Sequence, residues 1–510
     1  MIPTLEEGDE ADIGLLLEGT YPYIRGGVSG WVHQLISGLP EYRFALIFMG
    51  DKPDTYADGL KYELPDNVVH LESHYLMTPP ESGEPDPRPG KAQAFEHSWR
   101  THAWFRDTGS APPLEDMHAL LGGLATDSGI SLDDFNYSEQ AWFQITDSYQ
   151  EFSTEKSFLD YFWTVRAMHG PIFRVAEMAN VAARAKVYHA VSTGYAGLLG
   201  SMLHIRRQRP YMLTEHGIYT KERKIDLAQV DWIKDAEATY GAGMSTELSY
   251  LRRLWIRLFE GMGRLAYLKA DPILAITEAN KNRQIADGAS PARVEVIPNG
   301  VNIDRFKPLR EIQPASPPPV VCFIGRVVPI KDVKTFIRAM RTICTRVPEA
   351  EAWIIGNEDE DQGYADECHA LVRSLGIEDR IKFLGFQRID ELLPKVRMLV
   401  MTSISEGLPL VIIECFAAGV PAIVTDVGAC RELVEGGSEK DQALGSAGAV
   451  TAIADPQATA QECIRMIEDD DYWRSARAAG IRRVEALYTE HMLFENYRRV
   501  YGDALAKAGD

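Results

Sequence analysis

The stretch SISEGLPLVIIECFAAGVPAIVTDVG, residues 403–428, contains a loop, an apolar segment of helix length and a short β-rich run in direct succession. The β-rich run MLVMTS leads into it, and PAIVTD lies near its end. The runs AEAWIIG, RIKFLGF and GAVTAI recur nearby, each separated from the next by a segment long enough for a helix. This alternation predicts a mostly parallel sheet with helices on both faces.

The first half of the chain repeats the pattern less regularly. Its β-rich runs are IGLLLEG, FALIFMG, AKVYHAVS, PYMLTEHG and DPILAIT. A stretch at about 75–165 interrupts them, opening with the Pro-rich PPESGEPDPRPG and continuing with aromatic, helix-prone sequence. We therefore expect a first α/β domain over residues 1–300 with a mainly helical insertion at about 75–165, and a second α/β domain over 301–486.

Two further segments concern the connection between these domains. The Pro-rich end of IPNGVNIDRFKPLREIQPASPPP predicts an extended linker near residues 300–319. The last segment, about 487–510, has a helical pattern with no strand after it. Its apolar positions predict a helix that packs back onto the first domain.

Composition and charge exclude several classes of function. The formal net charge is −21, whereas binding to nucleic acids or anionic membranes needs a basic face. The apolar runs are far shorter than the roughly 20 residues of a membrane helix, and the N-terminus lacks a secretory signal pattern. The six cysteines match no zinc or CxxC spacing. We expect a cytoplasmic protein with free thiols, no nucleic-acid partner and no direct membrane insertion.

The loop within residues 403–428 is a candidate anion site. Glu406 follows the run MLVMTS, at the carboxyl end of a predicted strand, where open α/β sheets bind ligands. Pro409 is typical of the first turn of a helix. The N–H groups around Gly407, Leu408 and Leu410 would then point toward the loop and favour an anion there.

A second carboxylate, Glu414, lies eight residues farther along, in the apolar helix. A carboxylate in such surroundings needs a partner. Taken alone, either glutamate has a structural interpretation, as a helix cap or a member of a salt bridge. Glu406 and Glu414 together, with the glycines and the proline at this spacing, favour a ligand site.

The segment FIGRVVPIKD, residues 323–332, is a second candidate site. Arg326 and Lys331 follow a predicted strand, in the loop before a helix. An arginine fork and a lysine point charge at such a place suit a diphosphate. The alternative is a pair of solvated surface cations.

Together these motifs resemble the family 4 retaining glycosyltransferases of GT-B fold, in which GR…K precedes the E-G-x-P-L…E pattern by about 75 residues. Three further segments resemble that family: IPNGVNIDRFKP, ILAITEANKNRQIADGA and DDDYWRSARAAGIRRVEALYT. The segments EGTYPYIRGGVSGWVHQLISGLP and TEHGIYTKERK, with the long insertion, are similar to the subgroup that builds the Pel exopolysaccharide. The resemblance implies two Rossmann-like, doubly wound domains facing a cleft.

The resemblance also implies roles for individual residues. Arg326 and Lys331 would bind the donor diphosphate and stabilise the departing nucleotide, while Glu406 would contact the donor sugar. Glu414 would bind the ribose hydroxyls, and Gly407 and Leu408 would offer backbone N–H groups near the sugar and phosphate.

In the first domain, the resemblance implies that His216 would face the reacting sugar across the cleft. His216 follows the run PYMLT, and His189 has a similar place one strand earlier. We favour a functional role for His216 and a structural one for His189. Whether His216 orients or only binds the sugar stays open, as does the identity of any nucleophile.

The leading hypothesis is a transfer of a hexose or N-acetylhexosamine from a UDP-sugar to a growing polysaccharide, with retention of the anomeric configuration. No essential divalent metal is expected, because cations and amides can stabilise the leaving diphosphate. The acidic run EDDDYWR, residues 468–474, is interpreted as a solvated charge run rather than a metal site. The resemblance further implies protein contact with inner-membrane synthase or export components, which would make the protein peripheral to that membrane.

Two alternatives remain. A GT-B-type UDP-sugar epimerase would interconvert UDP-sugars without an acceptor. A catalytically silent scaffold would bind nucleotide or polymer for a membrane synthase, although the full set of two cations and two glutamates counts against it.

The glycines in YPYIRGGVSGW, residues 21–31, open a predicted helix but match neither GxGxxG nor a P-loop. A plain tight turn is one interpretation. The resemblance favours another, in which the backbone at Gly26 and Gly27 contacts the diphosphate from the side opposite Arg326 and Lys331.

Overall fold

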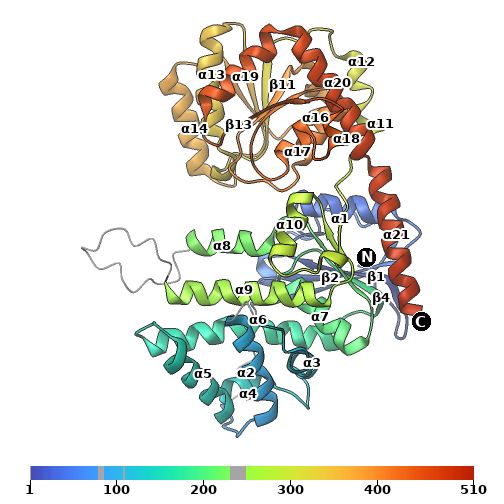
Figure 1. Ribbon diagram of the computed structural model, residues 1–510, viewed down its shortest axis with the longest axis vertical. Helices are drawn as coiled ribbons and strands as arrows, with labels where there is room; N and C mark the ends of the chain where they lie inside the picture. The colour runs from blue at the N-terminus through green and yellow to red at the C-terminus, as the bar shows by residue number, and fades with distance from the viewer. Residues whose placement is uncertain (1, 78–84, 107–109, 230–248, 510) are drawn as a thin grey trace. The chain divides into compact units, whose positions relative to one another are not determined.

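The computed structural model describes residues 2–77, 85–106, 110–229 and 249–509 of the chain (Figure 1). Part of the Pro-rich opening of the predicted insertion lies outside these residues. The chain forms two compact units. Unit 1 comprises residues 1–275, 281–295 and 498–510, and unit 2 comprises residues 276–280 and 296–497.

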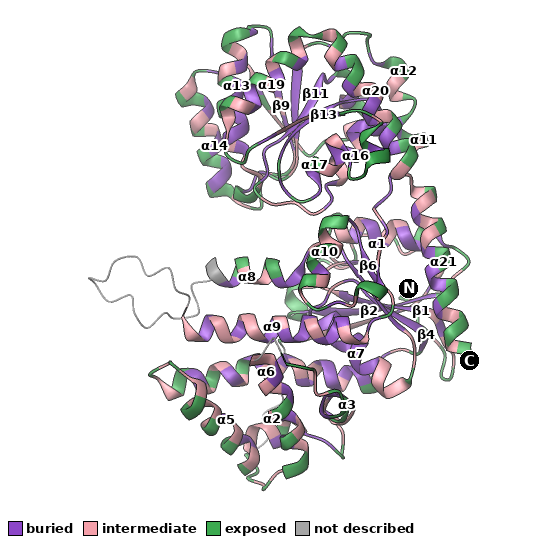
Figure 2. Cartoon of the chain, viewed as in Figure 1, coloured by how far each residue is buried: buried purple, intermediate pink, exposed green. Residues whose placement is uncertain are grey.

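Unit 1 is built on a seven-stranded sheet in the order β3-β2-β1-β4-β5-β6-β7. The strands are β1 Ala11–Glu18, β2 Phe44–Gly50, β3 Val68–Tyr75, β4 Ala185–Ala190, β5 Tyr211–Glu215, β6 Ile273–Ala275 and β7 Val294–Val296. The neighbouring pairs from β3 to β6 run parallel. The strands β1, β2 and β5 are almost continuously buried, as expected for strands covered on both faces (Figure 2).

Helices before and after the insertion cover this sheet. They are α1 Gly27–Gly38, α7 Tyr195–Arg207, α8 Tyr219–Gln229, α9 Tyr250–Lys269 and α10 Glu278–Ala286. Between β3 and β4 the chain forms the predicted helical insertion. Its helices are α2 Ala92–Arg106, α3 Leu114–Gly123, α4 Leu132–Tyr137, α5 Glu139–Phe152 and α6 Phe158–Val181. The helical segment therefore runs past the expected end near residue 165.

Unit 2 contains a six-stranded sheet in the order β10-β9-β8-β11-β12-β13, with every neighbouring pair parallel. The strands are β8 Val320–Ile324, β9 Glu351–Ile355, β10 Ile381–Gly385, β11 Met398–Met401, β12 Ala422–Thr425 and β13 Gly448–Thr451. The helices are α11 Ile303–Phe306, α12 Leu309–Ile312, α13 Val333–Arg346, α14 Gln362–Leu375, α15 Ile389–Leu392, α16 Leu410–Ala418, α17 Cys430–Glu435, α18 Glu439–Gln442, α19 Pro456–Glu468 and α20 Asp470–Leu487. Two parallel α/β sheets, one with a helical insertion, confirm the predicted fold class.

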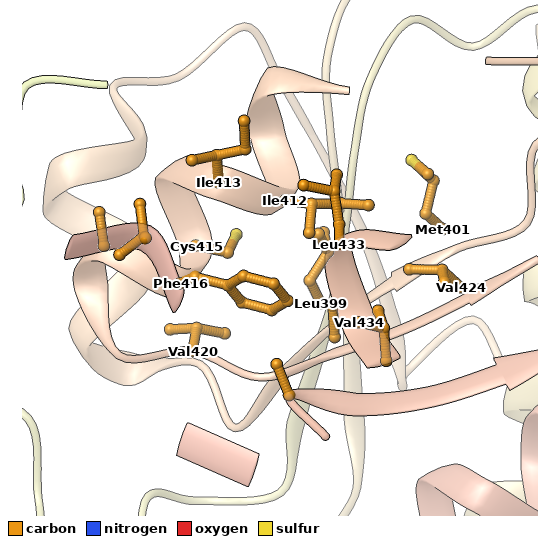
Figure 3. Close-up of a cluster of buried hydrophobic side chains, with 14 of the residues drawn as sticks. Leu399, Met401, Ile412, Ile413, Cys415, Phe416, Val420, Val424, Leu433 and Val434 are labelled. Carbon is orange, nitrogen blue, oxygen red and sulfur yellow. The ribbon is translucent and has the colours of Figure 1, made fainter. Parts of the chain in front are cut away.

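Two hydrophobic clusters form the core of unit 2. One of them packs α16 and α17 against β11 and β12 (Figure 3). The side chains of Ile412, Ile413, Cys415 and Phe416, from α16, are all buried there. This packing holds the loop before α16 in place. All six cysteines of the chain are free thiols in unit 2.

The segment near 300–319 belongs to unit 2, and its Pro-rich end, 314–319, contains no helix. The segment contains α11 and α12, and Phe306 is fully buried in the core of unit 2. Arg310 pairs with Glu485 of α20 at 2.5 Å. Burial of Phe306 therefore ties the first part of this segment to the core of unit 2.

The last helix, α21 Glu490–Gly509, is shared by the two units, with the change at Arg498. Its final turns pack on unit 1. Tyr501 is fully buried, with its hydroxyl 2.8 Å from Nδ1 of His189 in β4. Arg498 pairs with Glu41 at 2.5 Å. No helix within the described residues has the length and apolar character needed to cross a bilayer.

Two glycines bring loops of unit 2 into close backbone contact. A Cβ on Gly428, after β12, would lie 2.1 Å from the carbonyl oxygen of Glu406, after β11. A Cβ on Gly356, after β9, would lie 1.9 Å from the carbonyl oxygen of Gly325, after β8. Both glycines have positive φ, so the loops depend on glycine for conformation and for space.

We expect Gly428→Ala to destabilise unit 2 by about 1–3 kcal/mol through the clash with the Glu406 loop, in addition to the strain of a left-handed backbone. Gly376→Ala is the matched control, because Gly376 has φ +64 and open space around its Cβ position. Chemical denaturation of both variants measures the difference. Equal destabilisation of the two would contradict the close approach.

Candidate donor site and family

Two loops of unit 2 meet at the point where the strand order of its sheet reverses. β8 and β11 are parallel neighbours, although β9 and β10 lie between them in sequence. The loops that follow β8 and β11 therefore leave the sheet side by side. Open α/β sheets bind ligands in the crevice at such a switch point.

An ion pair joins these loops. Nζ of Lys331, after β8, lies 2.5 Å from Oε1 of Glu406, after β11, with 21% and 10% of the two side chains exposed. The hydroxyl of Ser403 donates to the same carboxylate oxygen at 2.6 Å. The backbone N–H of Ile404 donates to the carbonyl of Ile330 at 2.8 Å. The structure thus brings two of the predicted site residues together in a fixed arrangement.

Arg326 does not join this pair. Its guanidinium forms an ion pair with Glu360, and 56% of its side chain is exposed. Glu360 belongs to the loop after β9, which contacts the Arg326 loop through Gly356. Arg326 and Lys331 therefore lie in the same loop after β8, while their side chains have separate carboxylate partners.

The start of α16 presents backbone donors beside Glu406. α16 begins at Leu410, and Pro409 has an extended backbone one residue before it, not within the first turn as expected. Among the described residues, the N–H groups of Gly407, Leu408 and Leu410 donate no hydrogen bond. Unsatisfied N–H groups at a helix N-terminus favour an anion or a hydroxyl oxygen.

Glu414 lies in the second turn of α16. Burial raises its pKa to about 7, while Arg305 lowers it and Asp390 raises it. Arg305 is engaged by Asp390 at 2.8 Å, and the carboxylate of Glu414 forms no hydrogen bond or ion pair within the described residues. Within the described part of the protein, the carboxylate of Glu414 therefore lacks the partner that we expected from the sequence.

The glycines of the first loop lie at the N-terminus of α1 in unit 1. Gly27 is the first residue of α1 and Gly26 precedes it, both exposed. A Cβ at either position would meet no atom within 4 Å. Packing within unit 1 therefore does not require glycine at these positions.

The two candidate histidines of unit 1 have different surroundings. His216 directly follows β5, and its ring packs against Trp31 of α1 with ring centroids 4.3 Å apart. His189 is fully buried, with Nδ1 2.8 Å from the hydroxyl of Tyr501 and Nε2 2.8 Å from that of Thr214. Burial lowers the pKa of His189 to about 3, which fits a neutral structural residue.

Sequence reasoning missed one carboxylate of unit 1, Glu18, at the carboxyl end of β1. β1 and β4 form the switch point of this sheet. Glu18 accepts hydrogen bonds from the hydroxyl of Tyr219 at 2.8 Å and from the N–H of Ala196 at 3.2 Å. The signal was present in the run IGLLLEG, where a carboxylate and a glycine end a buried strand.

The acidic run at 468–474 has structural partners. Asp469 caps α20 by accepting from the N–H of Tyr472 at 2.9 Å, and Asp470 pairs with Arg397 at 2.7 Å. Within the described residues, no three His, Cys, Asp or Glu side chains are grouped as metal ligands.

Two family models match the chain. The model described as Domain of unknown function (DUF3492) matches residues 11–292, which include the strands β1 to β6 and the insertion of unit 1. The model described as Glycosyl transferases group 1 matches residues 318–469, which include both loops of the candidate site.

The similarity to curated relatives covers only part of this chain. D-inositol 3-phosphate glycosyltransferase of Nocardia farcinica is 30% identical over 184 residues, which are 33% of this chain and 41% of the relative. The enzyme of that name from Salinispora arenicola is 28% identical over 262 residues, 47% of this chain and 56% of the relative. The chain thus spans about half the length of the curated relatives it matches.

Solved structures share the fold over nearly the whole chain. HepE of Anabaena, in complex with UDP, has a TM-score of 0.58 at 15% identity, covering 96% of this chain and 100% of its own. Sucrose-phosphate synthase of Thermosynechococcus elongatus has a TM-score of 0.56 at 16% identity, covering 97% of this chain and 99% of its own. These likenesses confirm the predicted GT-B fold.

The chain therefore belongs to the DUF3492 family, and its second half carries a glycosyl transferases group 1 domain.

Proposed function

We propose that the protein is a retaining glycosyltransferase that moves a hexose or N-acetylhexosamine from a UDP-sugar to a growing exopolysaccharide, without an essential divalent metal. The observation that carries the proposal is the Lys331–Glu406 pair beside the unbonded N–H groups at the start of α16. One cation, backbone amides and a carboxylate meet there within a group 1 domain.

The chemistry of these groups suits loss of a nucleoside diphosphate. Negative charge develops on the leaving phosphate oxygen, and donors that are already oriented stabilise it at small reorganisation cost. Glu406 neutralises Lys331 in the free protein but occupies only part of its donor capacity, since an ammonium has three donors. Lys331 can therefore bind a phosphate oxygen while Glu406 orients it and binds sugar hydroxyls.

Glu414 completes the proposed donor site. Its unpartnered carboxylate would accept hydrogen bonds from the ribose hydroxyls of the nucleotide. We assign His216 and the backbone at Gly26 and Gly27 to the sugar and diphosphate contacts of unit 1. HepE, which shares the fold, was solved in complex with UDP, and this supports UDP as the nucleotide.

The polymer and its partners are the finer part of the proposal. The loop at 21–31 and the segment 214–224 resemble the Pel exopolysaccharide glycosyltransferases, and this resemblance supports a Pel-like polysaccharide as acceptor. The same resemblance supports peripheral association with inner-membrane synthase or export proteins through protein contact. UDP-sugar interconversion without any acceptor would indicate an epimerase instead, and donor binding without turnover would indicate a scaffold.

The function is tested with purified protein and a panel of nucleotide sugars in the presence of a chelator. We expect at least one UDP-sugar to raise the thermal midpoint and to be turned over when an acceptor is supplied. The anomeric proton signals of the product report the stereochemistry. Failure of every UDP-sugar to stabilise the protein would overturn the donor assignment.

Truncation of the two cations should separate their roles. We expect Lys331→Ala to lower kcat/KM by roughly a hundredfold, as for other groups that stabilise a developing anion. Arg326→Ala should also reduce turnover, while both variants remain folded by circular dichroism. Arg346→Ala is the control, because Arg346 is also an exposed arginine that pairs with a glutamate. Wild-type activity in both variants would contradict the assignment of Arg326 and Lys331 to the donor diphosphate.

The raised pKa of Glu414 predicts a pH dependence of stability. Between pH 4.5 and about 7 the folded protein keeps a proton that the unfolded chain has lost. The contribution of Glu414 to the free energy of unfolding therefore falls as pH rises through this window. Glu414→Gln should remove this part of the slope, whereas Glu485→Gln, at an exposed position, should leave it unchanged.

The same group predicts the pH dependence of donor binding. The ionised carboxylate accepts stronger hydrogen bonds than the neutral acid. UDP should therefore bind the wild type more tightly at pH 8 than at pH 6, as measured by calorimetry, and this difference should vanish in Glu414→Gln. An unchanged pH profile in that variant would contradict the assignment of Glu414 to the ligand.

A further inference from the structure

The helical insertion and α9 of unit 1 enclose a cavity of about 150 Å³. It is separate from the candidate residues described above. Most of its lining is apolar, with Ile145, Val165 and Phe173 from the insertion and Leu258, Met262 and Leu265 from α9. An apolar cavity of this volume takes up apolar molecules in preference to water.

The cavity is long and narrow. Its lining follows one face of α9 from Tyr250 to Leu265, a distance of roughly 20 Å at 1.5 Å per residue. It also follows α2 from Phe95 to Arg106 and α6 from Tyr161 to Phe173, which pack near α9 (Figure 1). The lining thus follows the lengths of three helices, and we call this cavity the channel.

The two histidines that line the channel carry no charge at neutral pH. His102 and His169 approach each other through Nε2 at 3.0 Å, and their Nδ1 atoms bond backbone carbonyls at 2.7 Å. Burial lowers the pKa of His102, and lowers that of His169 to about 3. The middle of the channel therefore suits a neutral, apolar occupant.

Two arginines line the cavity, one at the end of α2 and one within α9. Arg106 is the last residue of α2, and its guanidinium carbon lies 3.9 Å from the ring centre of Phe152, the last residue of α5. Arg257, from the third turn of α9, lies near enough to act on Arg106 as a like charge. Tyr161 and Tyr250 also line this end, with ring centroids 6.3 Å apart.

These arginines form no ion pair within the described residues, although both line the cavity. Burial lowers the pKa of Arg106 and the charge of Arg257 acts in the same direction, while Glu151 opposes them. Two neighbouring, partly buried guanidinium groups without a carboxylate partner are unfavourable unless an anion joins them.

We propose that this channel binds one long hydrocarbon chain with an anionic head, the chain lying along α9 and the head between Arg106 and Arg257. The shared chemistry fits a fatty acid or a lipid with a phosphate head. The inference goes beyond the proposed transfer reaction and does not rest on the donor site. Trp142 and Trp163, half exposed on α5 and α6, are consistent with a lipid source.

The first experiment titrates the full-length protein with dodecanoate at pH 7.5, using calorimetry. We expect saturable binding at one site, at least tenfold tighter than binding of 1-dodecanol, which lacks the charge. Absence of dodecanoate binding would overturn the proposal. Equal affinity for 1-dodecanol would contradict the proposal that the arginines bind an anionic head group.

Variants locate the site. Ala141→Phe and Leu254→Trp each fill part of the channel, at a buried and at a partly exposed position respectively, so that one is expected to fold if the other does not. Each should reduce dodecanoate affinity at least tenfold. Leu159→Trp is the matched control, because Leu159 is exposed and does not line the cavity. Wild-type affinity in a folded, filled variant would overturn the proposal.

Head-group variants and vesicles complete the test. Arg257→Gln and Arg106→Gln should weaken dodecanoate binding while leaving dodecanol binding unchanged, and Arg174→Gln, which loses an exposed ion pair with Glu177, should change neither. Loss of affinity for both ligands in equal measure would contradict the head position. Phosphatidylglycerol vesicles that displace dodecanoate would support a lipid as the natural occupant, and retention of dodecanoate would support a free acid.

Discussion

The ion pair between Lys331 and Glu406 is the interaction on which the candidate site of unit 2 depends. It joins the two loops that leave the sheet at its switch point, and it places a cation, a carboxylate and free N–H groups within one small region. A pair with so little solvent exposure is strongly oriented, and loss of one partner leaves the other charge partly buried. The same pair therefore joins the loops, and in the proposed donor site it would also supply charges for an anionic ligand.

The packing of α16 against the sheet and the close contact at Gly428 support this arrangement. α16 buries most of its apolar side chains against β11 and β12, and Gly428 brings a third loop against the backbone of Glu406. Glu414 is the exception in α16, since its carboxylate has no partner within the described residues. Within the described residues, this carboxyl group is the feature of α16 that the proposed donor site explains, since a ligand there would supply its missing partner.

Much of the fold was predictable from the sequence, because each β-rich run has the length and composition of a buried strand. The site loops were predictable in the same way, since Glu406 and Lys331 directly follow such runs. The orientation of Arg326 was not, because its partner Glu360 follows a different strand and the pairing depends on the loop contact at Gly356. The linker was misjudged because burial of Phe306 is a tertiary effect. The channel in the insertion arises from the packing of helices that are distant in sequence, so no local sequence pattern predicts it.

The shared helix α21 has a consequence for how the protein is made. Unit 1 begins with β1, yet the side chain that closes the space over His189 comes from Tyr501, in the last turns of the chain. A ribosome releases the strands and the insertion of unit 1 long before it reaches Arg498. Domains generally fold as units during synthesis. In unit 1, however, the side chain of Tyr501 that packs against His189 becomes available only after unit 2 has been translated. Completion of the packing over His189 therefore follows the synthesis of unit 2.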